Sequence, residues 1–182
     1  MLKEETEFDG NAIGIDPAEC GCTDCIVGNS IPESDLSSIR ELLQEHFTEG
    51  RKIVNRTYAS ALVAYKSADG IYTYASLDLP DRSAEIRVIE PEVSPYDGES
   101  IVICENSGDY EPNLRADEDP DNVKVISSDN RGGITMAAEK HFRFSRRIAN
   151  RTGKTLVFHK SYGEYGYVAL DVRRGTKVSI IR

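Results

Sequence analysis

The stretch HFRFSRRIANRT runs from His141 to Thr152, and HFTEGRKIVNRT runs from His46 to Thr57. When residues 45–57 are aligned with 140–152 without a gap, seven of thirteen positions are identical. A second match follows in the same order. LVAYKSADGIYTYASLDL (62–79) resembles LVFHKSYGEYGYVALDV (156–172) with one single-residue gap. Two matched blocks in the same order indicate that the chain contains a duplicated unit.

Each copy begins with a predicted helix. In the first copy apolar residues recur every three or four positions, and Ser34 or Asp35 is suited to cap the start. Asn55 is the expected stop, because asparagine adopts the left-handed conformation that commonly ends helices. Asn150 is the matching stop in the second copy. The repeated Asn-Arg-Thr is therefore interpreted as a helix terminus followed by the first strand residue.

Strands are predicted after each helix. Residues 57–66 are rich in Tyr, Val and Ala, and IYTYASLDL (71–79) alternates between two faces, as a strand does. AEIRVIE (84–90) is the third strand of the first copy. TLVFHK, EYGYVALDV and TKVSIIR repeat this order in the second copy. CIVG (25–28) and NVKVIS (122–127) are possible leading strands.

These elements predict an α+β fold, with antiparallel sheets backed by two helices about a pseudo-twofold axis. The expected parts are an acidic arm (1–33), a first repeat (34–90), an acidic linker with one strand (91–127) and a second repeat (128–182). The order of elements resembles that of sliding clamps and of the TATA-binding-protein core. Because both of those folds handle DNA, the resemblance implies contact with nucleic acid.

Charge is distributed unevenly along the chain. The four parts carry net charges of −7, −2, −8 and +8, which together give the total of −9. Such asymmetry indicates either a surface for polyanions in the basic part or acidic and basic parts that neutralise each other. No apolar run approaches the ~20 residues of a membrane helix. The acidic start MLKEETEFDG is unlike a signal peptide, so we expect a cytoplasmic protein, or a virion component if the protein is viral.

Cations concentrate around the second predicted helix. The candidate phosphate-binding residues are Lys140, Arg143, Arg146, Arg147, Arg151 and Lys154. Lys140, Arg143 and Arg147 have the spacing of one helix face, and a row of cations can follow a phosphate backbone. The alternative is an ordinary solvated helix face. Tyr162, Tyr165 and Tyr167 are candidates for stacking on bases if they are exposed.

Three polar pairs occur in both copies: His46 with His141, Lys66 with Lys160, and Asp78 with Asp171. They are either structural residues or parts of two symmetric ligand sites. A catalytic site kept in duplicate would be unusual, so the pairs argue against an enzyme.

Three of the four cysteines are clustered. Cys20, Cys22 and Cys25 have the spacing C-x-C-x-x-C, and Cys104 is the fourth. A structural zinc site needs four ligands, which Cys104, or a histidine such as His46 or His159, would complete. Reduced thiols without metal, a disulfide and an iron–sulfur cluster remain the alternatives.

The segment DPAECGCTDCIVG (16–28) around these cysteines resembles a short segment in uncharacterised proteins of actinobacteria and their phages. The resemblance covers thirteen residues. It implies an actinobacterial or phage origin and no particular activity.

The sequence contains no phosphate-binding loop, dinucleotide-binding glycine motif, zinc-protease motif or nucleophile elbow, so no catalytic residue is named. Three hypotheses follow. The first is a non-enzymatic protein that binds nucleic acid or a phosphorylated ligand through the basic helix. The second is an assembly protein, such as a phage virion component, that associates head to tail through acidic and basic surfaces. The third is a metal-dependent enzyme.

Overall fold

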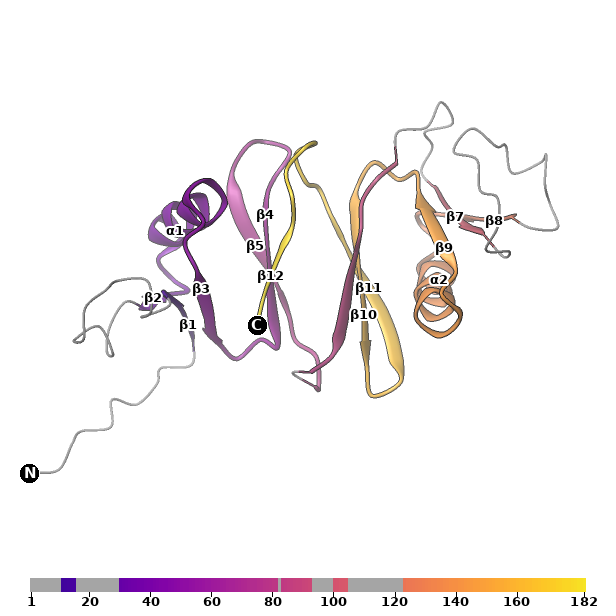
Figure 1. Cartoon of the computed structure of the whole chain (residues 1–182), viewed down its shortest axis with the longest axis horizontal. Coiled ribbons are helices and arrows are strands. Elements are labelled where there is room, and N and C mark those ends of the chain that lie inside the picture. The colour runs from indigo at the N-terminus through magenta and orange to yellow at the C-terminus, as the bar shows by residue number, and fades with distance from the viewer. Residues whose placement is uncertain (1–10, 16–29, 82, 93–99, 105–122) are drawn as a thin grey trace, which may run out of the picture. The chain divides into compact units, whose positions relative to one another are not determined.

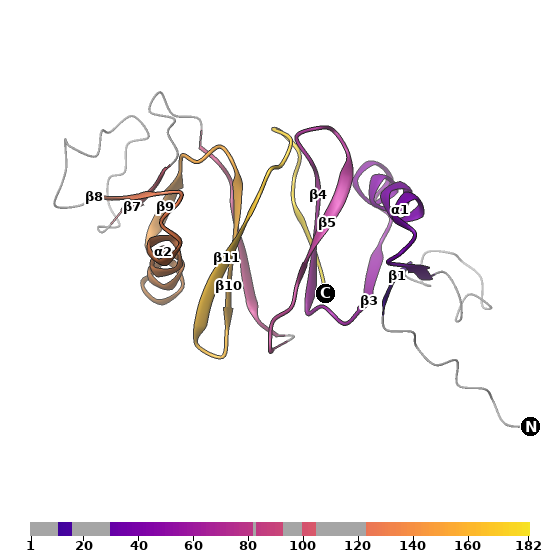
Figure 2. The same cartoon turned by 180° about the vertical axis from the view of Figure 1, so that it is seen from behind.

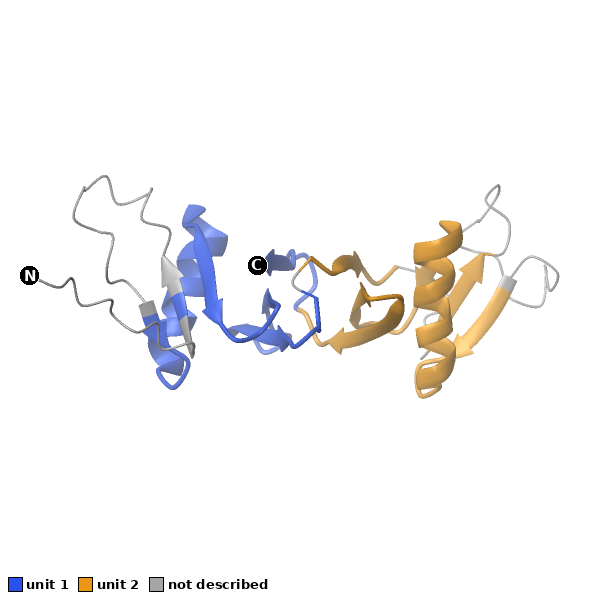
Figure 3. Ribbon diagram, turned by 90° about the horizontal axis from the view of Figure 1, so that it is seen from below, with its two compact units in different colours: residues 1–82, 173–182 blue, residues 83–172 orange. Residues whose placement is uncertain are grey.

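The protein has an α+β fold, seen in a computed structural model that describes residues 11–15, 30–81, 83–92, 100–104 and 123–182. The chain divides into two compact units (Figure 3). Unit 1 comprises residues 1–82 and 173–182, and unit 2 comprises residues 83–172. In the described part of the chain each unit holds one helix and two antiparallel sheets of three strands each.

Unit 1 places its helix against both of its sheets. The first sheet has the strand order β2 (Ser30–Pro32), β1 (Asn11–Ile15), β3 (Ile53–Thr57), and the second has the order β12 (Ser179–Ile181), β4 (Ala61–Lys66), β5 (Tyr72–Leu77). Helix α1 (Leu36–Glu49) contributes the buried side chains Ile39, Leu42 and Leu43. These pack with Ile13, Leu62, Ala64 and Ile181, so one core joins the helix to strands of both sheets (Figure 1).

Unit 2 has the same plan. Its sheets have the orders β8 (Val123–Ser127), β7 (Ser100–Cys104), β9 (Arg147–Asn150) and β6 (Glu85–Ile89), β10 (Thr155–Ser161), β11 (Glu164–Leu170). Helix α2 (Arg131–Phe144) buries Ile134, Ala137 and Ala138. The core is completed by Ile101, Ile103, Ile126, Ile148, Leu156 and Phe158. Figure 2 shows α2 beside the β7–β9 sheet from behind.

The two units share strand registers as well as strand order. Ile13 on β1 pairs with Ile31 and Asn55, and Ile101 on β7 pairs in the same way with Ile126 and Asn150. The predicted strands SIVIC and NVKVIS are confirmed as β7 and β8. The two copies therefore resemble each other in strand register as well as in sequence. Descent from one duplicated segment remains a prediction.

Both helices begin with a side-chain cap. Asp35 accepts a hydrogen bond from the Ser38 amide (3.2 Å), and Asn130 accepts one from the Gly133 amide (2.9 Å). A Cβ on Gly133 would lie 2.6 Å from Ile126 Cγ2 and 2.8 Å from Asn130 Nδ2. Glycine is therefore required where the capping asparagine approaches α2.

The helices end earlier than the sequence predicts. Gly50 (φ 75°) ends α1 and Ser145 (φ 53°) ends α2, both in the left-handed conformation. Asn55 instead lies in the middle of strand β3, and Asn150 is the last residue of strand β9. The Asn150 side-chain oxygen accepts hydrogen bonds from the Thr152 amide (3.1 Å) and hydroxyl (2.6 Å). The repeated Asn-Arg-Thr thus forms an Asx turn where a strand ends, within the last residues of β3 and from the last residue of β9, and its assignment as a helix stop is wrong.

The third strand of each copy belongs to the other unit. AEIRVIE contains strand β6 as expected, yet β6 pairs with β10 of unit 2, with Val88 opposite Val157. TKVSIIR contains β12, which pairs with β4 of unit 1, with Ile180 opposite Val63. The compact units of the structure therefore divide the chain after Arg82 and again after Val172. The sequence shows that a strand is present but not which strand it pairs with.

The described part of the chain contains no helix long and apolar enough to cross a membrane.

Candidate functional site

The six candidate phosphate-binding cations do not share one helix face. Lys140 and Arg143 lie on α2, Arg147 lies on β9, and Arg146 lies in the connection between them. The predicted helical spacing fails because Ser145 ends α2 before Arg146. Arg151 is 5% exposed and donates its backbone amide to Ser100 O, so it is not part of a solvent-facing surface. Lys154 is exposed in the turn before β10.

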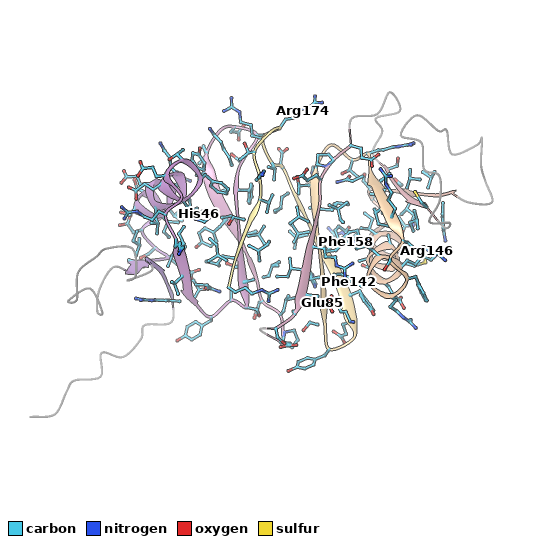
Figure 4. The ribbon with its side chains drawn as sticks, viewed as in Figure 1. His46, Glu85, Phe142, Arg146, Phe158 and Arg174 are labelled. Carbon is cyan, nitrogen blue, oxygen red and sulfur yellow. The ribbon has the colours of Figure 1, made fainter. Side chains whose placement is uncertain are left out.

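Five residues close together in the sequence at the end of α2 form what we call the α2-terminal patch: Lys140, Arg143, Phe144, Arg146 and Arg147. Figure 4 labels Arg146 at this end of the helix. Phe144 is 56% exposed, and the Arg143 guanidinium lies 5.2 Å from its ring centroid. Arg143 forms an ion pair with Glu139 (2.6 Å), and Arg147 forms one with Glu92 (3.3 Å). Both arginine side chains remain more than half exposed, so these pairs hold them weakly.

The matching end of α1 has a different charge. The equivalent residues there are Glu45, Thr48, Glu49, Arg51 and Lys52. Two acids and two bases cancel in unit 1, whereas the α2-terminal patch has four bases and no acid. Glu45 and Arg51 also form an ion pair with each other (2.9 Å). The cationic and aromatic character is therefore specific to unit 2.

The repeated histidines hold the helix ends. The distance from His46 Nδ1 to Arg51 O is 2.6 Å, and from His141 Nδ1 to Arg146 O it is 2.8 Å. A carbonyl oxygen only accepts, so Nδ1 carries the proton in both rings. His46 Nε2 also lies 2.8 Å from Ser179 Oγ, which ties α1 to β12. These bonds account for both histidines as structural residues.

The other repeated polar residues also have local roles or are exposed. Lys66 Nζ lies 4.9 Å from the Tyr72 ring centroid, and Lys160 lies 3.8 Å from a Glu85 carboxylate oxygen. Asp78 and Asp171 are exposed.

The three tyrosines considered for base stacking differ in environment. Tyr162 is 76% exposed in the β10–β11 turn, at φ 48°. Tyr165 packs against Phe142, with ring centroids 6.0 Å apart. Tyr167 packs on the unit 2 core. Only Tyr162 of the three has a largely exposed ring.

The proposed zinc ligands are not brought together in the described residues. Cys20, Cys22 and Cys25 lie outside them. Cys104, at the end of β7, is a free thiol that is 4% exposed, and burial raises its pKa. In the described ranges no three His, Cys, Asp or Glu side chains are grouped as metal ligands would be, and His46 is already bonded at both ring nitrogens. Zinc binding remains a prediction.

Unit 2 also contains a cavity that the sequence did not indicate. Its volume is about 200 Å³, and it is lined by Ser128, Ile134, Thr152, Lys154, Leu156, Tyr167 and Ala169. Ile134 lies in the first turn of α2, so the cavity is at the opposite end of the helix from the α2-terminal patch. Of the predicted cations, Lys154 alone lines it. The sequence does contain a signal for this cavity. When the two copies are aligned, Lys154 corresponds to Ala59 and Ser128 corresponds to Glu33, so both charge and size change at these positions.

Comparisons with known proteins add no relative. No family model matches the chain, and no significant match exists among the curated proteins or the solved structures. The topological resemblance to sliding clamps and the TATA-binding-protein core therefore gains no support from them.

Proposed function

We propose that the protein is a non-enzymatic binding protein whose α2-terminal patch contacts a nucleic-acid strand. The observation that supports this best is the contrast between the helix ends. Four bases and an exposed aromatic ring occupy positions in unit 2 where unit 1 has a balanced set of charges.

The patch has the two chemical elements that a single strand requires. Exposed arginines neutralise phosphates and release counterions, which makes affinity dependent on salt. An exposed ring offers a surface on which a base stacks without regard to sequence. Phe144 provides that ring beside Arg143. Glu139 and Glu92 compete with phosphates for the two arginines, so we expect moderate affinity that falls steeply as salt increases.

Fluorescence anisotropy with labelled single-stranded DNA, single-stranded RNA and duplex DNA, at low and moderate salt, tests the proposal. Charge reversal at Arg143 and Arg147 should weaken binding at least about tenfold and reduce the salt slope by about two. Arg143→Thr with Phe144→Glu, which copies Thr48 and Glu49, should have a similar effect.

The matched control reverses Arg174 and Lys177, two exposed cations of unit 1. This control variant changes the net charge by the same amount as the patch variant, but at residues outside the α2-terminal patch. Equal loss of binding in the control and the patch variants would contradict the assignment to α2, as would affinity unaffected by either patch variant. Short-chain polyphosphate that competes as well as DNA would identify a phosphorylated ligand instead of nucleic acid.

Self-assembly through acidic and basic surfaces is the second candidate function. It is supported by the same basic patch, while most of the acidic segments on which it depends lie outside the described residues. Salt-sensitive oligomers in analytical ultracentrifugation would favour it, and a monomer at low salt would count against it. A cytoplasmic or virion location is part of both proposals.

A further inference from the structure

A carboxylate of unit 1 occupies the place that corresponds to the cavity of unit 2. Tyr74 Oη donates a hydrogen bond to Glu33 Oε1 (3.2 Å), and Glu33 is held two residues before the cap of α1. Burial, followed by the nearby Glu33 charge, raises the pKa of Tyr74, so the phenol keeps its proton and remains a donor. Unit 1 therefore shows a propionate group, the end of a glutamate side chain, bound at this position of the fold.

The equivalent positions of unit 2 lack that carboxylate. Ser128 stands two residues before the cap of α2, where unit 1 has Glu33. Tyr167 corresponds to Tyr74, since both pair with the fourth residue of the central strand, Phe158 in unit 2 and Ala64 in unit 1. Replacement of a glutamate by a serine leaves space beside a retained tyrosine, and the cavity lies there.

The charge at the rim also changes in the direction that a bound anion requires. Lys154 lines the cavity, and the matching residue of unit 1 is Ala59. The pairing of these two residues follows from their shared contacts, because Asn55 Nδ2 donates to Ala59 O and Asn150 Nδ2 donates to Lys154 O. Unit 1 thus has an internal anion and no cation at this place, whereas unit 2 has a cation and an open space.

We infer that the cavity of unit 2 is a binding site for a small carboxylate, or for the acidic side chain of a peptide, held between Tyr167 and Lys154. A volume of about 200 Å³ is below the size of most pockets for drug-sized ligands, so it suits a single short group. Ser128 lines the same space and its hydroxyl is available as a further donor, whereas the Thr152 hydroxyl already donates to Asn150 Oδ1. The site is independent of the nucleic-acid proposal.

Nuclear magnetic resonance titration of the full chain with propionate tests the inference, with propionamide as the uncharged isostere. Signals of Ser128, Tyr167 and Ala169 should shift with propionate and not with propionamide. Tyr167→Phe should weaken binding about tenfold and Lys154→Ala about fivefold. An acetylated and amidated glutamate should bind at least as well as propionate if the natural ligand is a peptide side chain. Equal shifts with propionamide, or stronger binding of inorganic phosphate, would overturn the inference.

Exchange of residues between the units gives a second test. Ser128→Glu places an internal carboxylate beside Tyr167 and should abolish propionate binding while leaving nucleic-acid binding at the α2-terminal patch within about twofold. Glu33→Ser combined with Ala59→Lys should transfer propionate binding to unit 1, with shifts at Tyr74. Propionate binding that survives Ser128→Glu would show that the carboxylate does not enter the cavity.

Discussion

The cores of the two units solve one packing problem in opposite ways. Unit 1 places large residues on its helix, Leu42 and Leu43, against the small Ala64 of its central strand. Unit 2 places Ala137 and Ala138 on the helix against the large Phe158 of the strand (Figure 4). All of these side chains are buried. The comparison shows that strand order and register stay the same while the large side chains lie on the helix in one unit and on the strand in the other. Dense packing requires that a larger side chain on one element be matched by a smaller one on the other.

Loss of residues 173–182 should have the largest effect, and it should fall on unit 1. The deletion removes β12, the buried Ile181 and the Ser179 hydroxyl that bonds to His46. We expect hydrogen exchange of α1 to become fast while α2 stays protected. Unit 2 expressed alone, as residues 83–172, is the complementary control and should keep its protection. Protection of α1 that survives the deletion would contradict the assignment of β12 to unit 1.

Phe158→Ala should destabilise the protein by about 3–5 kcal/mol, because it leaves a cavity opposite the two alanines of α2. The reciprocal change, Ala64→Phe, should cost about 1–3 kcal/mol through overpacking against Leu42 and Leu43. Chemical denaturation followed by circular dichroism measures both.

Adding Ala137→Leu and Ala138→Leu to Phe158→Ala copies the unit 1 arrangement and should restore part of the loss. A triple variant less stable than Phe158→Ala alone would show that the two cores are not exchangeable.

Asn150→Ala should cost more than Asn55→Ala, by about 1 kcal/mol. Both amides donate to a carbonyl four residues later, and Asn150 Nδ2 donates in addition to Ile89 O of β6 (3.1 Å). Asn150 is also fully buried, whereas Asn55 is half-buried. The free energies of unfolding of the two single variants give the difference. Equal costs would mean that the bond to β6 contributes little.

The smallest effect concerns pH. Burial lowers the pKa of His159 below its ordinary value of 6.5, and its cross-strand partners Gly166 and Ile86 carry no charge. The unfolded chain therefore binds a proton more readily than unit 2 does. The contribution of His159 to stability is present above pH 6.5 and is lost as the pH falls below that value.

His159→Tyr copies Tyr65 of unit 1 and should flatten the slope of unfolding free energy between pH 7.5 and 5. A slope unchanged in this variant would assign the pH dependence to other groups.

The sequence predicted which residues form strands better than it predicted where helices end. Alternation identified Tyr72–Leu77 and Glu164–Leu170, because residues on one strand obey a local period. Asn55 and Asn150 misled because asparagine serves equally well in helix stops and in Asx turns. The actual stops are Gly50 and Ser145, and the serine carries little sequence signal for a left-handed conformation.

Strand partnership and side-chain burial depend on contacts between distant segments, which the sequence does not show. Nothing in AEIRVIE indicates pairing with β10. The charge pattern places Arg151 among the candidate surface cations, whereas the fold buries it. The α2-terminal patch was partly predicted through Lys140 and Arg143, while the cavity required knowing that Ser128 and Tyr167 meet. Matching Glu33 with Ser128 across the copies would have been the available clue.

Because the third strands are exchanged, the two units are completed at different times during translation. β4 pairs with β12, and these strands are separated by on the order of a hundred residues of chain, so the ribosome makes β12 long after α1. The described strands of unit 2 run from β6 to β11, and all of them precede β12 in the chain, so they are translated before β12 emerges. The unit 1 core is therefore completed only after the described strands of unit 2 have been made, and until then it lacks Ile181 and the bond from His46 to Ser179. During that interval the emerging chain exposes an incomplete apolar core to chaperones.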